Sequence, residues 1–155
     1  IKLVYIGDGN NVAHSLMFGG AKVGMHVTVC SPAGFEPNPE IFRLAQADAA
    51  QTGARIEIHD DPLAAVKDVD IIYTDVWSSM GQEKEHTRRI EAFTRHQVNE
   101  SLLAQARSDV LVMHCLPAHR GEEITDAVMD GPHSIVFDQA ENRLHVQKAI
   151  LSLVM

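Results

Sequence analysis

Residues 2–16 read KLVYIGDGNNVAHSL, and this stretch decides the fold. It begins with a short apolar run typical of a buried strand, continues through a turn rich in glycine and asparagine, and resumes as an amphipathic helical pattern. The same succession of strand, turn and helix recurs along the chain. The apolar runs predict strands over 2–6, 26–30, 55–59, 70–74, 110–114 and 134–137. The helical patterns predict helices over about 11–20, 39–52, 62–67, 84–92, 100–106, 122–129 and 141–154.

Strands that alternate with helices indicate a parallel sheet with helices on both of its faces. We therefore predict an α/β fold with a doubly wound, mainly parallel, Rossmann-like sheet. The 155 residues fit one domain, 1–155. The chain begins at Ile1, already inside a strand-like run, so we expect it to be part of a longer protein.

Composition narrows the classes of function. The chain has 13 basic and 21 acidic residues and a net charge of −8, which speaks against a nucleic-acid partner. No apolar run is long enough for a membrane span, so we expect no membrane association. The two cysteines, Cys30 and Cys115, are too few for a disulfide framework and favour a reducing, cytoplasmic location.

The sequence GDGNN at 7–11 follows the first predicted strand. It begins like a dinucleotide-binding fingerprint, but Val12 stands in place of the third glycine and no acidic residue ends the second strand. A nucleotide-dependent oxidoreductase is therefore disfavoured. Asn10 or Asn11 can cap the helix that follows, whose free N–H groups suit a carboxylate or a phosphate. The alternative is that the asparagines serve only as caps.

The sequence TDVWSSMGQE at 74–83 places Asp75 at the end of an apolar strand. Its carboxylate should lie at the carboxyl edge of the sheet, followed by Ser78, Ser79 and Gly81 in a small polar loop. A carboxylate beside hydroxyl and backbone N–H donors suits the ammonium and carboxylate groups of an amino acid. The alternative is that Asp75 caps the following turn, as aspartates at strand ends often do.

The sequence VMHCLPAHRGEE at 112–123 permits several interpretations. His114 and Cys115 are adjacent, and adjacent strand residues point to opposite faces, so a shared metal ion or a thiol activated by this histidine is disfavoured. His119 can still fold back towards the thiol. Cys115 can line a substrate pocket, or it can be a buried structural cysteine. Pro117 ends the strand and leaves the Leu116 carbonyl free to face a ligand.

The sequence AENR at 140–143 places Arg143 in the first turn of the last predicted helix. A cation there makes sense where an anion such as phosphate binds at the helix N-terminus. The alternative is a surface arginine paired with a neighbouring carboxylate.

Together, GDGNN, TDVWSSMGQE, HCLP at 114–117 and AENR resemble the ornithine carbamoyltransferases of the aspartate/ornithine carbamoyltransferase family. The resemblance covers the whole chain as the C-terminal, ornithine-binding domain. It implies transfer of a carbamoyl group from carbamoyl phosphate to the δ-amine of L-ornithine, giving L-citrulline and phosphate, without a metal or other cofactor. It also implies a homo-oligomer, a trimer or a multiple of trimers. The carbamoyl-phosphate domain, with its Ser-Thr-Arg-Thr and His-Pro-x-Gln motifs, is absent from this chain, so we expect the chain alone to be inactive.

By the same resemblance, Asn11 and the Met80 backbone hold the α-carboxylate of ornithine. Asp75 and Ser79 hold its α-ammonium group. A non-catalytic amino-acid-binding or regulatory module on the same fold is the alternative function, and selective ornithine binding is common to both.

The resemblance places Cys115 and the Leu116 carbonyl at the δ-amine, His114 beside the carbamoyl oxygen and Arg143 near carbamoyl phosphate. With Asp75, Cys115 and His114 form the expected catalytic group. The δ-amine has an ordinary pKa near 10 and must lose its proton before it can attack. Cys115 can assist by proton exchange rather than as a covalent nucleophile.

Overall fold

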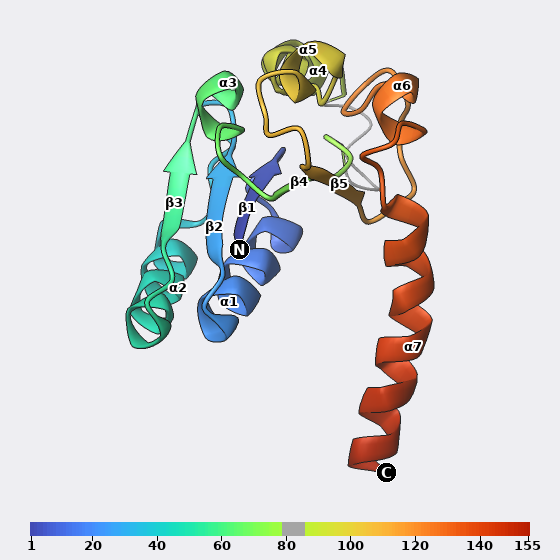
Figure 1. Ribbon diagram of the computed structural model, residues 1–155. Helices are drawn as coiled ribbons and strands as arrows, with labels where there is room; N and C mark the ends of the chain where they lie inside the picture. The colour runs from blue at the N-terminus through green and yellow to red at the C-terminus, as the bar shows by residue number, and fades with distance from the viewer. Residues whose placement is uncertain (79–85) are drawn as a thin grey trace.

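The computed structural model describes residues 1–78 and 86–155. Within these residues a five-stranded sheet has the order β3-β2-β1-β4-β5, with every pair parallel (Figure 1). The strands are β1 (Lys2–Ile6), β2 (His26–Cys30), β3 (Ile56–His59), β4 (Ile71–Thr74) and β5 (Leu111–His114). The predicted parallel α/β sheet is confirmed.

Helices connect the strands, and the predicted ones lie within a few residues of their expected positions. They are α1 (Asn11–Val23), α2 (Pro39–Thr52), α3 (Pro62–Ala65), α4 (His86–Phe93), α5 (Glu100–Leu103), α6 (Asp126–Met129) and α7 (Val136–Val154). A 3-10 turn, Thr94–His96, follows α4 directly. In the described residues no helix is long and apolar enough to cross a membrane.

The sheet is covered on both faces because β1, at its centre, is apolar at every position after Lys2. Leu3 and Tyr5 face one core, which α1 and α2 complete through alanines and Met17. Val4 and Ile6 face a second core built with α3, α5, α6 and the start of α7. The doubly wound arrangement follows from this alternation of side chains along the strands.

The predicted sixth strand, 134–137, is wrong. Ser134 forms only an isolated parallel bridge with Val112, and Val136 already begins α7. Ile135 and Val136 are β-branched and apolar, which is typical of a strand. The buried first turn of a helix can use the same residue types, as Val136 does against β5. Helix α7 therefore starts five residues before the predicted 141, and Figure 1 shows it extending away from the sheet.

Side-chain hydrogen bonds hold the carboxyl ends of the strands together. The Thr74 hydroxyl donates to the Ile6 carbonyl at 2.7 Å, and the Ser31 hydroxyl donates to the Gly7 carbonyl at 2.7 Å. At Gly9 a Cβ atom would lie 2.2 Å from the Pro37 backbone nitrogen, so only glycine permits this close approach of two loops. The edge that carries the polar motifs is therefore fixed by the fold itself.

Candidate active site

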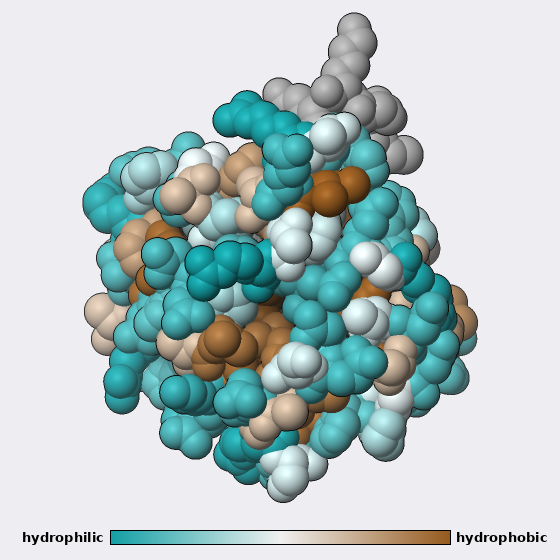
Figure 2. Space-filling model, turned by 90° about the horizontal axis from the view of Figure 1, so that it is seen from above, coloured by the Kyte–Doolittle hydropathy of each residue, from teal (hydrophilic) through white to brown (hydrophobic). Residues whose placement is uncertain are grey.

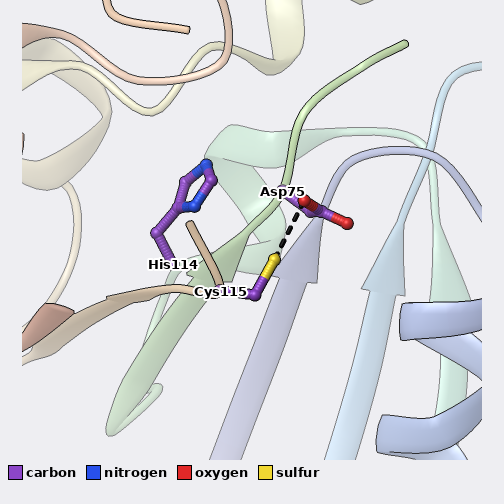
Figure 3. Close-up of side chains that lie close together, drawn as sticks. All are labelled: Asp75, His114 and Cys115. Carbon is purple, nitrogen blue, oxygen red and sulfur yellow. Dashed lines mark hydrogen bonds between the residues drawn. The ribbon is translucent and has the colours of Figure 1, made fainter. Parts of the chain in front are cut away.

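Asp75 and Cys115 meet at the carboxyl edge of the sheet, one residue beyond β4 and β5 respectively (Figure 3). The Cys115 thiol donates a hydrogen bond to Asp75 Oδ1 at 2.9 Å. Asp75 is 8% exposed, and the same oxygen accepts the Val76 N–H at 2.8 Å. The turn-capping interpretation of Asp75 therefore holds in part. In the described part of the chain no donor reaches the second oxygen, Oδ2, which leaves it free to bind a cation.

Cys115 is exposed, so its interpretation as a buried structural cysteine is wrong. Desolvation at the sheet edge, followed by the hydrogen bond to Asp75 and the charge of that carboxylate, raises the pKa of the thiol to about 12. At neutral pH the group is therefore a thiol that donates a hydrogen bond. A thiolate nucleophile is disfavoured at this position, in agreement with the expected non-covalent role.

His114 is 1% exposed, and both of its ring nitrogens are used by the chain itself. Nδ1 accepts a hydrogen bond from the N–H of Leu116 at 2.8 Å, so the ring proton is on Nε2. Nε2 donates a hydrogen bond to Glu123 Oε1 at 3.0 Å. Leu116 has a φ of 56°, a left-handed conformation that is costly for a branched side chain. The buried His114–Glu123 pair therefore holds Leu116, and with it the orientation of the Leu116 carbonyl.

The argument that His114 and Cys115 cannot reach one point is wrong. Single ligand atoms of Asp75, His114 and Cys115 all lie within 4.8 Å of one another. Strand alternation fails here because β5 ends at His114, and Cys115 belongs to the turn that follows. A metal ion at this point would nevertheless have to displace one of the two hydrogen bonds that His114 makes.

Arg89 connects the three loops that follow β1, β2 and β4, and the sequence analysis missed it. Its Nη1 donates to Asp8 Oδ2 at 2.7 Å and to the Trp77 carbonyl at 2.8 Å. The guanidinium also lies 5.0 Å from the centre of the Phe35 ring, at cation–π distance. Arg89 is 7% exposed. Its position four residues before the buried Phe93 was the available signal, because the two share one face of α4.

The first turn of α1 is arranged as the sequence predicted. The Asn10 side chain caps the helix by accepting the Val12 N–H at 2.9 Å. Asn11 is exposed, and its side-chain amide makes no hydrogen bond within the described residues. Ser79, Met80 and Gly81 lie outside the described residues.

The predicted position of Arg143 in the first turn of a helix is wrong. Because α7 begins at Val136, Arg143 lies about two turns into the helix, where the N-terminal dipole no longer acts on it. Its side chain is exposed. The first turn of α7 instead carries Gln139, which accepts the His114 N–H at 3.0 Å and donates to the Tyr73 hydroxyl at 3.1 Å.

Figure 2 looks down on the edge of the sheet towards which the strands run and shows apolar surface near its centre with hydrophilic residues around it. A face of this kind suits a small ligand with an aliphatic chain and charged ends.

Comparison with known proteins identifies the family to which this arrangement belongs. Residues 1–154 match the aspartate/ornithine carbamoyltransferase, Asp/Orn binding domain. The chain belongs to the aspartate/ornithine carbamoyltransferase family.

Curated members of this family are close in sequence. The ornithine carbamoyltransferase of Thermococcus kodakarensis is 57% identical over 155 residues, which are all of this chain and 49% of that protein. The anabolic ornithine carbamoyltransferase of Pyrococcus furiosus is also 57% identical over 155 residues, again 49% of its length. The chain therefore spans about half the length of the curated relatives that it matches.

Solved structures of family members agree with the fold. The structure of the Pyrococcus furiosus ornithine carbamoyltransferase superposes with a TM-score of 0.95 at 57% identity, covering all of this chain and 50% of that one. The Gloeobacter violaceus enzyme gives a TM-score of 0.91 at 51% identity, covering all of this chain and 51% of that one. The backbone at the sheet edge is thus one on which ornithine carbamoyltransferases are built.

Proposed function

We propose that residues 1–155 form the ornithine-binding domain of an ornithine carbamoyltransferase and that the carbamoyl-phosphate domain lies outside this chain. The complete enzyme would transfer the carbamoyl group of carbamoyl phosphate to the δ-amine of L-ornithine, giving L-citrulline and phosphate. The names of the relatives and the match over residues 1–154 support this reaction. A homo-oligomer, a trimer or a multiple of trimers, and a cytoplasmic location are part of the same proposal.

The observation that carries the proposal is the Asp75–Cys115 pair. Asp75 offers one free oxygen, Oδ2, while the thiol of Cys115 holds the other at 2.9 Å. A carboxylate fixed in this way and largely removed from water binds an ammonium group more strongly than an exposed one does. We assign Asp75 to the α-ammonium of ornithine, together with Ser79. Asn11 and the Met80 backbone would hold the α-carboxylate.

The δ-amine would lie beside Cys115 and the Leu116 carbonyl. The amine must either arrive without its extra proton or lose that proton at this position, because only a free electron pair on nitrogen can attack the carbamoyl carbon. That attack forms the new C–N bond, phosphate leaves with the electrons of the C–O bond, and the proton that the amine loses passes to the departing phosphate. Cys115 keeps its proton at neutral pH, so we propose that it orients the amine and Asp75 by hydrogen bonding.

His114 would act as a positioning residue. Both of its nitrogens serve Leu116 and Glu123, so its effect on the carbamoyl group would pass through the Leu116 backbone rather than through a direct contact. Arg143 would bind carbamoyl phosphate from the exposed face of α7 once the missing domain encloses that helix.

A chimeric enzyme tests the proposal. The chain is joined to the N-terminal half of the Pyrococcus furiosus relative, and citrulline formation is compared with that of the chain alone. We expect citrulline from the chimera, none from the chain alone, and no carbamoylaspartate when aspartate replaces ornithine. A folded chimera that binds ornithine without forming citrulline would favour the amino-acid-binding module, and carbamoylaspartate would reassign the substrate.

A further inference from the structure

A second cluster of ligating side chains lies apart from the Asp75–Cys115 pair, in the loop after β5. Single ligand atoms of His119, Glu122 and Glu123 all lie within 4.8 Å of one another. His86, the first residue of α4, also faces this cluster, because its Nε2 lies 3.5 Å from Glu122 Oε1. We call these four residues the loop cluster. The proposed carbamoyl transfer gives a role only to Glu123 Oε1, through its hydrogen bond from His114.

The distances within the loop cluster are those of ligands around an ion rather than of direct hydrogen bonds. His119 Nδ1 lies 3.6 Å from Glu122 Oε2, and His86 Nε2 lies 3.5 Å from Glu122 Oε1. A charge-assisted N–H···O hydrogen bond is about 2.7–2.9 Å long. Two ligands bound at about 2.0 Å to a tetrahedral zinc ion lie about 3.3 Å apart. Each separation is close to that spacing, but the two involve different oxygens of Glu122. His86 does not belong to the group whose ligand atoms all lie within 4.8 Å, so its ring would have to move towards the other three ligands.

Unpartnered carboxylate oxygens give an independent indication of a cation. Glu123 is 0% exposed, and its Oε1 already accepts from His114 Nε2 at 3.0 Å and from the His119 N–H at 2.6 Å. Its Oε2 is buried with no hydrogen-bond partner, and Glu122 Oε2 is likewise buried without one. Leaving a buried carboxylate oxygen without a hydrogen-bond partner destabilises the folded chain. A cation between the two carboxylates would remove that destabilisation.

The loop cluster also contains elements of an outer shell. The second ring nitrogen of His86, Nδ1, lies 3.4 Å from the Ser78 hydroxyl, which can fix the orientation of the ring. Two neutral imidazoles and two carboxylates carry a charge of −2, which a divalent ion neutralises. Imidazole nitrogens with carboxylate oxygens form a ligand set typical of Zn²⁺.

We propose that His86, His119, Glu122 and Glu123 bind a Zn²⁺ ion that connects the start of α4 to the loop after β5. Glu123 would use Oε2 for the ion and keep Oε1 for His114. The ion would thus link the segment after β4 and the segment after β5, which also carry Asp75 and Cys115. The site shares only Glu123 with the proposed carbamoyl transfer, because His86, His119 and Glu122 have no role in that reaction.

Zinc titration of the whole 155-residue chain tests the proposal, with binding measured by calorimetry. The variants are His119→Ala and Glu122→Gln, and the matched control is Cys115→Ser, which removes a ligand from the competing cluster of Asp75, His114 and Cys115. We expect one Zn²⁺ per chain, a loss of affinity of more than about 100-fold in each loop-cluster variant, and no change beyond about twofold in the control. Circular dichroism verifies that each variant is folded, and the exposed position of His119 makes its replacement compatible with the fold.

Cobalt substitution supplies a second readout. A Co²⁺ ion in the loop cluster should show d–d bands without a thiolate-to-cobalt charge-transfer band, and Zn²⁺ should raise the unfolding temperature of the chain but not of the His119→Ala variant. The proposal is overturned if the chain binds no zinc, if binding survives His119→Ala and Glu122→Gln, or if Cys115→Ser abolishes it. A thiolate charge-transfer band would also overturn it, because it would place the ion on Cys115.

Discussion

The cluster at the strand ends and the helix α7 differ in how they are held. Asp75 and His114 are buried, and Glu123 and Arg89 fix the turns around them through hydrogen bonds within the chain. Arg143 belongs to a helix that is exposed from Phe137 onwards at nearly every position. The chain thus holds Asp75 and His114 by its own hydrogen bonds and leaves Arg143, the residue proposed to bind phosphate, on an uncovered helix.

This difference shows which part of the candidate site the chain completes by itself. A binding site needs side chains whose positions are fixed before the ligand arrives. The strand-end cluster meets that requirement in this chain, whereas among residues 1–78 and 86–155 helix α7 is anchored through Val136 and Gln139 in its first turn. We therefore expect changes at the strand ends to act within the chain and changes at Arg143 to act only when a second domain is present.

The largest expected effect comes from Arg89. Its replacement in Arg89→Met leaves Asp8 without its partner in a place where both side chains are largely buried, at 8% and 14% exposure. Breaking a buried ion pair on one side costs about 3–5 kcal/mol. Urea unfolding should show a loss of this size in the free energy of unfolding.

The matched control is Arg143→Met, which should change the free energy of unfolding by less than about 0.5 kcal/mol, because the side chain is exposed. Equal losses in the two variants would contradict the contrast between the two regions.

Asp75→Asn should have the next largest effect, on ornithine rather than on folding. It removes the charge proposed to hold the α-ammonium group, and a hydrogen bond to a charged group contributes about 1.5–3 kcal/mol. In the chimeric enzyme we expect kcat/KM for ornithine to fall by at least about tenfold. Asp138→Asn, on the exposed first turn of α7, is the control and should leave kcat/KM unchanged. A wild-type value for Asp75→Asn would remove Asp75 from the site.

The smallest effect concerns the protonation of Cys115. Because partial desolvation of the sulfur and Asp75 raise the thiol pKa to about 12, alkylation by iodoacetamide at pH 8 should be slow for an exposed cysteine and should accelerate about tenfold per pH unit. The experiment uses Cys30→Ala, so that one thiol remains. Adding Asp75→Asn removes a cause of the raised pKa and should speed alkylation at pH 8.

The raised pKa of Cys115 also makes the free energy of unfolding depend on pH. The folded chain favours the protonated thiol, so this stabilisation is present below the ordinary pKa of 9 and is lost as the pH rises towards 12.

In the alkylation experiment, a rate that is independent of pH between 8 and 10 would contradict the raised pKa of Cys115.

The sequence predicted the sheet well because each strand is a short apolar run between turn residues, and parallel strands buried on both faces need such runs. It failed at 134–137, where burial of one helical turn imitates a strand. It also placed Asp75 and Cys115 correctly at the sheet edge, since that depends only on where the strands end.

The connections around those residues could not be read from the sequence. Glu123 lies in a polar loop and Arg89 in a charged helix, and both are buried only because distant segments fold over them. The pairing of Arg89 with Asp8 joins residues 81 positions apart. The side-chain ligand atoms of His114 and Cys115 lie close together because the chain turns at Leu116. The left-handed φ of Leu116 could not be predicted, because leucine does not favour that conformation.

The most direct test of the central proposal is a nuclear magnetic resonance titration of the isolated chain with L-ornithine, which detects weak binding residue by residue. We predict that the backbone amide signals of Asn11, Val76, Cys115 and Leu116 shift with saturation, while those of α7 beyond Gln139 do not. L-aspartate at the same concentration should leave the signals of Val76 and Cys115 in place. Shifts confined to another part of the chain, or equal shifts with L-aspartate, would contradict the assignment of the strand-end cluster to ornithine.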